Sequence, residues 1–160
     1  MTVNEYLWYL EWLKIDMWDK YERYIQAFDK ATSPQSSLNA SEDGLKHKST
    51  ENNREKLLTD SVIVARERYF KAADKHNEYK YQLCLNLKKL SSTHQLVLFS
   101  IYVAGIYKPM EKRRDGLSEM LCIKEHELPK VVWAAKKELK KVLREQGIEI
   151  EDKKNGKSKN

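Results

Sequence analysis

The fold is decided by residues 53–90, which read NREKLLTDSVIVARERYFKAADKHNEYKYQLCLNLKKL. This stretch contains no Gly or Pro, and its apolar residues recur at alternating intervals of four and three, as in a heptad repeat. The positions in this register are Leu58, Val62, Ala65, Tyr69, Ala72, His76, Tyr79, Leu83, Asn86 and Leu90. The spacing predicts a coiled-coil-like helix of about 35 residues, about 50 Å long, that packs along a partner helix.

Two polar side chains, His76 and Asn86, fall within this register. A polar residue in such a seam can fix the register of packing at some cost in stability. We therefore interpret His76 as a structural residue rather than a metal ligand or a catalytic base.

The natural partner is a helix predicted over residues 3–30, which also lack Gly and Pro. One apolar set has helical spacing and comprises Val3, Tyr6, Leu10, Leu13, Met17, Tyr24 and Ala27. A second set widens the apolar face and comprises Leu7, Trp8, Trp12, Ile15, Trp18, Tyr21, Ile25 and Phe28. This helix is either buried on several sides, as in an ordinary core, or in contact with another chain.

Three of the four tryptophans of the chain lie in this first helix, and aromatic enrichment is typical of interface cores. Residues 32–53 are rich in Ser, Asn and charge and predict a mobile linker. Its length permits the flanking helices to pair within one chain or to exchange between subunits. We expect a homodimer, and the candidate oligomerisation residues are Trp8, Trp12, Met17, Tyr69, His76 and Leu83.

The composition excludes several classes of protein. The 160 residues are 41% apolar and 34% charged, with a mean hydropathy of −0.77 and only 5 Gly and 3 Pro. These values argue against a membrane span and a β-sandwich and favour an all-α protein. The first residues lack the features of a signal peptide, so we expect a cytoplasmic location. The net charge of +6 suggests an anionic partner.

No catalytic or metal-binding motif is recognisable, and we predict neither an enzyme nor a bound cofactor or metal. The four histidines are scattered, and Cys84 and Cys122 are far apart without a CxxC pair. The charge, in contrast, is unevenly placed. Residues 1–107 hold 15 basic and 14 acidic side chains, whereas residues 108–160 hold 15 and 10, which places five of the six net charges in the last third.

This basic third has the pattern of a helix-turn-helix. An apolar run from Leu96 to Val103 predicts a first helix that stops near Gly105. Residues 117–121 predict a short helix, and the apolar face of the following long helix comprises Leu128, Val132, Ala135, Leu139 and Val142. These three helices predict a trihelical core whose last helix docks in the major groove of double-stranded DNA.

The residues expected to face bases are Lys124, His126, Glu127, Lys130 and Val131. Those expected to bind phosphates are Lys112, Arg113, Arg114, Lys136, Lys137 and Lys140. Acidic Glu125 and Glu127 at the tip, and Pro129 near the start of the long helix, weigh against base-specific reading. The alternative interpretation is an amphipathic helix pair with a solvated basic face.

The sequence thus predicts a long antiparallel helical hairpin followed by a trihelical domain. The hairpin spans residues 1–90 with its linker at 32–53, and the helix-turn-helix domain spans residues 91–147. Residues 148–160 are polar and predict a frayed basic tail.

The layout resembles phage and prophage late-gene transcriptional regulators of the ArpU and RinA kind, whose C-terminal part is similar to region 4 of bacterial sigma factors. The resemblance covers most of residues 4–143 and is most specific in LSEMLCIKEHELPKVVWAAKKELKKVL. The positions that such motifs keep apolar correspond here to Leu117, Leu121, Ile123, Leu128, Ala135 and Leu139. This sequence departs from the family pattern at the turn, where Cys122 replaces a common Gly, and at Lys124 and Glu127.

The resemblance implies control of phage genes at promoter DNA in the bacterial cytoplasm, with host RNA polymerase as a further partner. The alternative function is a phage-encoded helical adaptor or inhibitor that binds a host protein such as RNA polymerase.

Overall fold

The computed structural model describes residues 1–33 and 47–152, with side chains described for residues 1–33 and 53–152. These residues form helices and turns, which confirms the all-α prediction. The long helices are α1 (Val3–Thr32), α2 (His47–Leu87) and α5 (Leu128–Glu145), and the shorter ones are α3 (Ser92–Phe99) and α4 (Leu117–Met120). Four single turns complete the order: η1 (Ser100–Ala104), η2 (Gly105–Tyr107), η3 (Met110–Lys112) and η4 (Glu125–Glu127). No helix among the described residues is long and apolar enough to cross a membrane.

The chain divides into two compact units. The first contains Met1–Trp12 and Asn77–Asn160, and the second contains Leu13–His76. Both boundaries fall inside the long helices α1 and α2, whereas the sequence predicts a boundary at residue 90. The start of α1 and the end of α2 therefore share a core with the C-terminal helices.

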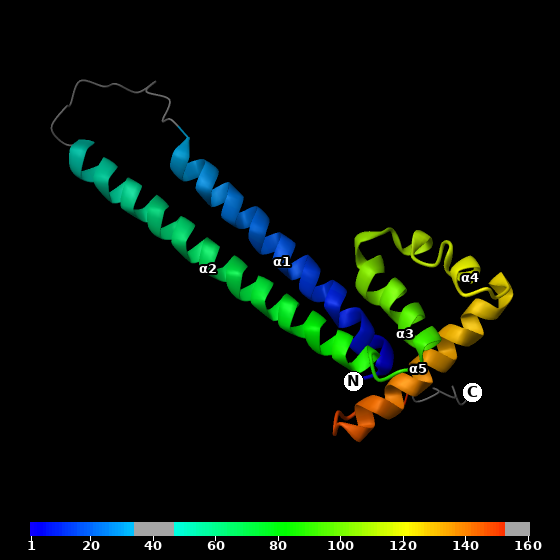
Figure 1. The fold of residues 1–160 in the computed structure, drawn as a ribbon. Helices are drawn as coiled ribbons and strands as arrows, with labels where there is room; N and C mark the ends of the chain where they lie inside the picture. Colours follow the sequence, from blue (N-terminus) through cyan, green and yellow to red (C-terminus); the bar gives the residue numbers. More distant parts are fainter. Residues whose placement is uncertain (34–46, 153–160) are drawn as a thin grey trace, which may run out of the picture. The chain divides into compact units, whose positions relative to one another are not determined.

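Helices α1 and α2 run antiparallel beside each other within one chain (Figure 1). In the second unit the Tyr69 ring lies 5.2 Å from that of Tyr21 and stacks on that of Tyr24. Every position in the predicted register is buried or half-buried, from Leu58 to Asn86 within α2 and at Leu90, which lies beyond the end of the helix at Leu87. The register is thus confirmed, and it faces α1 of the same chain.

The predicted linker is too long at both ends. Thr32 belongs to α1, and α2 already begins at His47, so only residues 34–46, which lie outside the described part, remain of it. A polar sequence does not exclude the first turns of a helix, since water can satisfy their free N–H groups.

Asn86, the second polar residue of the register, is buried in the first unit with its side-chain amide hydrogen-bonded. Its Nδ2 donates to the hydroxyl of Tyr6 at 2.7 Å, and the hydroxyl of Tyr79 donates to the Tyr6 carbonyl at 2.7 Å. These bonds are possible only in one register of α1 against α2. Because it is buried beside Tyr6, the pKa of Tyr79 is raised well above its ordinary value.

The core of the first unit joins the start of α1 and the end of α2 with α3, α4 and α5. Its fully buried side chains include Leu7, Leu10, Leu83, Leu87, Leu98, Leu139 and Leu143. The apolar run after α3 stays helical through η1 and η2 to Tyr107, beyond the predicted stop at Gly105. The Ser100 carbonyl lies 2.6 Å from the position that a Cβ of Gly105 would occupy, so glycine is needed there for close packing.

The predicted frayed tail is wrong for residues 148–152. Ile150 is buried in the core, Ile148 is half-buried, and the Ile148 N–H donates to the Leu143 carbonyl at 3.0 Å. Arg144 also donates to the Ile150 carbonyl at 3.1 Å. The two isoleucines pack on the core of the first unit and, together with these two hydrogen bonds, order this short segment, whereas residues 153–160 lie outside the described part.

Candidate nucleic-acid interface

The predicted helix-turn-helix, which consists of α4, α5 and the turn between them, is built on an apolar stripe of α5. The stripe comprises Leu128, Val132, Ala135, Leu139 and Leu143, all buried. Leu117 of α4 is buried in the same core, and Leu121 and Ile123 of the turn pack against it. This packing fixes the orientation of α5 and thereby selects the side chains that it presents to solvent.

The turn between α4 and η4 has a left-handed residue at Cys122, with φ 54°. The Ile123 N–H donates to the Ser118 carbonyl at 3.0 Å and closes the turn. A residue with a side chain is strained at this φ, so Cys122 lowers the stability of the turn relative to a glycine at the same position.

The start of α5 accounts for two residues that weigh against base reading in the sequence. Pro129 lies in the first turn, where its missing N–H costs no helical hydrogen bond. The carboxylate of Glu127 accepts a hydrogen bond from the Lys124 N–H at 3.0 Å and so caps the turn before α5. Glu127 therefore has a structural role in place of the base contact expected from the sequence.

The surface that α5 presents is basic with one aromatic side chain at its centre. We define the outer face of α5 as Lys130, Trp133, Lys137 and Lys141, which recur at three- and four-residue intervals and are exposed. Trp133 is 66% exposed, and the Nζ of Lys137 lies 5.4 Å from its ring centroid. Trp133 is not among the residues predicted from the sequence, because its spacing from Lys130 and Lys137 places it on the same face but does not show that it is exposed.

The other residues expected to face bases differ in exposure. Lys124, His126 and Lys130 are exposed near the start of α5, as predicted for side chains that reach a ligand. Val131 is half-buried and packs against the core, so its assignment as base-facing is wrong. Its position in the helical repeat turns it away from the exposed stripe.

The residues expected to bind phosphates fall into three groups. Lys112, Arg114 and Lys137 are exposed. Lys136 is half-buried over the Tyr102 ring at 5.2 Å, and Lys140 forms an ion pair with Asp152. Arg113 is buried and paired with Glu11, so its assignment as a phosphate contact is wrong.

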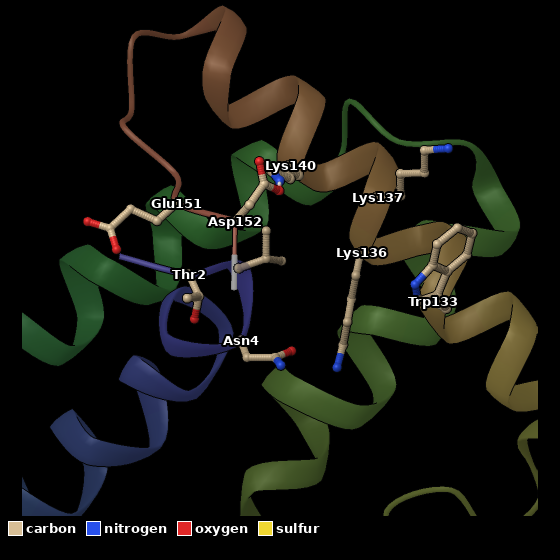
Figure 2. A pocket seen from close by; sticks show the side chains of 9 residues that line it. Thr2, Asn4, Trp133, Lys136, Lys137, Lys140, Glu151 and Asp152 are labelled. Carbon is tan, nitrogen blue, oxygen red and sulfur yellow. Dashed lines mark ion pairs between the residues drawn. The ribbon is translucent and has the colours of Figure 1, made fainter. Parts of the chain in front are cut away.

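A cleft of about 370 Å³ lies where α5 meets the start of α1 (Figure 2). Its lining residues are Thr2, Val3, Asn4, Trp133, Lys136, Lys137, Lys140, Glu151 and Asp152. In Figure 2, Lys136 extends toward the side of Asn4, whereas Lys137 points away from it. Asp152 lies against Lys140 and is also 3.2 Å from Arg144, so a carboxylate of the chain itself occupies this end of the cleft.

A second, larger cleft of about 1020 Å³ runs between α5 and the start of α3. Its wall is held by Glu138, whose carboxylate accepts hydrogen bonds from the N–H and hydroxyl of Ser91 and contacts Nδ1 of His94. The hydrogen bond with His94 is the main cause of the lowered pKa of Glu138. Trp133, Lys137 and Lys141 line the same cleft, so the outer face of α5 borders both hollows.

The residues expected to mediate oligomerisation are scattered over different environments. Leu83 and His76 are buried, and Trp8 is half-buried with its ring 5.2 Å from Tyr102 and beneath Arg113. Because Leu83 is fully enclosed in the core of its own chain, its assignment as an oligomerisation residue is wrong. Met17 and Tyr69 are half-buried, and Trp12 is 71% exposed.

No protein-family model, curated protein or solved structure matches this chain significantly. Within the described residues, no group of three or more His, Cys, Asp or Glu side chains could hold a metal ion. The proposal for function therefore rests on the geometry of the molecule and on its charge.

Proposed function

We propose that this protein is a transcriptional regulator that binds double-stranded DNA through the outer face of α5. The observation that supports the proposal is an exposed stripe of three lysines and one tryptophan on a helix held by a buried core. An α-helix fits the major groove, and lysines at such intervals can contact phosphates on its rims. Exposed Arg114 and Lys112, in the segment before α4, add further positive charge.

Trp133 gives this surface an apolar contact at its centre. In the major groove, thymine presents a methyl group, which an apolar side chain can contact. Lys130 and Lys124 are exposed near the start of α5 and can donate hydrogen bonds to base edges. We therefore expect contacts with phosphates to supply most of the affinity for DNA and contacts with base edges to supply little of it.

The test measures binding to duplex DNA as a function of salt concentration. Replacing Lys137 and Lys141 by Glu should weaken binding at low salt more than tenfold and reduce the salt slope by about 0.9 for each phosphate that is no longer neutralised. The matched control is Lys71→Glu together with Lys56→Glu, on exposed positions of α2 in the other unit. Equal binding by the Lys137/Lys141 variant and the control would contradict the proposal.

A second candidate function is supported by an apolar hollow on the start of α1. This hollow, about 680 Å³, is lined by Thr2, Asn4, Glu5, Trp8, Tyr9 and Trp12. An exposed Trp beside a hollow is typical of protein-binding surfaces. If the protein is an adaptor for host RNA polymerase, Trp12→Ala should abolish binding to the purified polymerase and leave DNA binding unchanged.

A further inference from the structure

The hairpin unit carries a continuous cluster of aromatic rings from both of its helices. We define the aromatic cluster as Trp18, Tyr21, Tyr24, Phe28, Tyr69 and Phe70. Trp18 packs edge-on against Tyr21 at 5.7 Å, and Tyr21 contacts Tyr69 at 5.2 Å. Tyr69 then contacts Tyr24 at 6.4 Å and Phe70 at 5.5 Å, and Tyr24 contacts Phe28 at 6.4 Å. These contacts link the six rings into one cluster that joins α1 and α2.

This cluster is incompletely covered by its own chain. Trp18 is 50% exposed, Phe28 46% and Phe70 55%. Among the described side chains of this unit, the buried ones are Leu13, Ala72 and His76. Two helices share only one seam, so a hairpin with apolar surface outside that seam needs a further layer of helices.

We infer that a second copy of this chain covers the aromatic cluster, hairpin against hairpin, to form a four-helix arrangement. The cluster exposes a few hundred Å² of aromatic surface, since each ring carries about 150 to 250 Å². That is the size of the apolar centre of an interface that buries about 800 Å² on each partner. A two-fold axis would place the cluster against itself, which makes an aromatic surface its own complement.

The charge of the hairpin favours a second copy over a charged partner. Residues 13–76 carry 12 Lys and Arg against 11 Asp and Glu, a net charge of +1, whereas the rest of the chain carries +5. Two acidic residues beside the cluster, Asp16 and Asp19, are paired within α1 to Lys20 and Arg23. With a net charge so close to zero, two such hairpins repel each other only weakly.

The test is the oligomeric state of the full chain, measured by sedimentation equilibrium without DNA, so its outcome is independent of the proposed DNA binding. We expect a dimer whose dissociation constant rises about thirtyfold or more in Trp18→Lys and in Phe70→Lys. The matched control is Trp12→Lys, because Trp12 is more exposed than either residue and lies outside the cluster. This control should remain dimeric.

Circular dichroism distinguishes a lost interface from a lost fold. Trp18→Phe keeps an aromatic ring at the same position and should retain the dimer. If Trp18→Lys loses helical signal, the oligomeric state of Phe70→Lys decides whether the cluster forms the interface. Two results would overturn the inference. The first is a wild-type chain that is still monomeric at about 100 µM, well above the micromolar range typical of weak interfaces, and it would mean that a different protein covers the cluster. The second is a Trp12→Lys variant that dissociates as much as Trp18→Lys and Phe70→Lys do.

Discussion

The guanidinium of Arg113 donates two hydrogen bonds to the carboxylate of Glu11, from Nη1 to Oε2 at 3.0 Å and from Nη2 to Oε1 at 2.7 Å. The two residues are 102 positions apart in the chain. Arg113 also donates from Nε to the Lys108 carbonyl at 3.1 Å and lies over the Trp8 ring at 5.3 Å. One side chain thus fastens the segment before α4 to α1.

Removing this buried pair should destabilise the protein strongly. We expect Arg113→Ala to lower the free energy of unfolding by about 3 kcal/mol, because it removes two charge-assisted hydrogen bonds from a largely buried Glu11 carboxylate. Arg113→Lys should recover only part of the loss, since an ammonium cannot form the two parallel hydrogen bonds. Urea denaturation measures both effects. The neighbouring Arg114 is exposed, so Arg114→Ala is the control; an equal loss there would contradict the structural role of Arg113.

Gly105 should tolerate no side chain. A Cβ at this position would lie 2.6 Å from the Ser100 carbonyl and 3.3 Å from Cγ of Arg113. We expect Gly105→Ala to cost about 1 to 3 kcal/mol of unfolding free energy, despite the higher helix propensity of Ala. Thermal denaturation of Gly105→Ala is compared with that of Ala104→Gly, at an exposed neighbouring position. The second variant measures the effect of helix propensity alone, so the difference between the two reports the steric clash of the Cβ at residue 105. A Gly105→Ala variant that is more stable than wild type would contradict this prediction and show that the backbone around Ser100 can move to make room for the Cβ.

The contact between Glu138 and His94 predicts a dependence of stability on pH. Folding lowers the pKa of Glu138, so its contribution is present above the ordinary value of about 4.3 and is lost as the pH falls through the folded pKa. The difference in unfolding free energy between wild type and Glu138→Gln should therefore be largest near neutral pH and shrink in acid. Denaturant titrations across this range measure it, and a difference that stays constant would contradict the assignment.

Asp152 should oppose the proposed DNA binding, since its carboxylate pairs with Lys140 and Arg144 on α5. We expect Asp152→Asn to raise the affinity for duplex DNA about threefold at low salt, with the gain vanishing as salt screens the charges. Glu149→Gln removes an equal charge from an exposed position of the same segment and serves as control. If both variants gain equally, the effect reflects net charge alone.

Much of the architecture was predictable from the sequence because it depends on periodicity. The register of α2 and the apolar stripe of α5 follow from spacing along one helix. The register is confirmed, and so is the stripe from Leu128 to Leu139, but its last buried residue is Leu143 and the predicted Val142 is only half-buried. Contacts between distant segments were not predictable in this way. Nothing in the sequence distinguishes Arg113, buried against Glu11, from exposed Arg114 beside it.

The surface residues show the same limit. The basic charge of residues 108–160 is visible in the sequence, but the partition of the lysines between the outer face of α5 and internal pairs depends on the position of Asp152. Ile148 and Ile150 are too few to order a segment by themselves, yet the core already built by α1 and α5 provides the surface on which they pack. Trp133 was readable as part of a basic stripe once its exposure was known.

The left-handed turn residue Cys122 makes the unmodified protein a convenient spectroscopic tool. Its thiol is exposed, whereas the thiol of Cys84 is half-buried and burial raises its pKa. A maleimide dye at near-neutral pH should therefore label Cys122 selectively, because the thiolate is the reacting form. The label would lie in the turn that leads into α5, where its fluorescence anisotropy reports a ligand arriving at the outer face without any engineered residue.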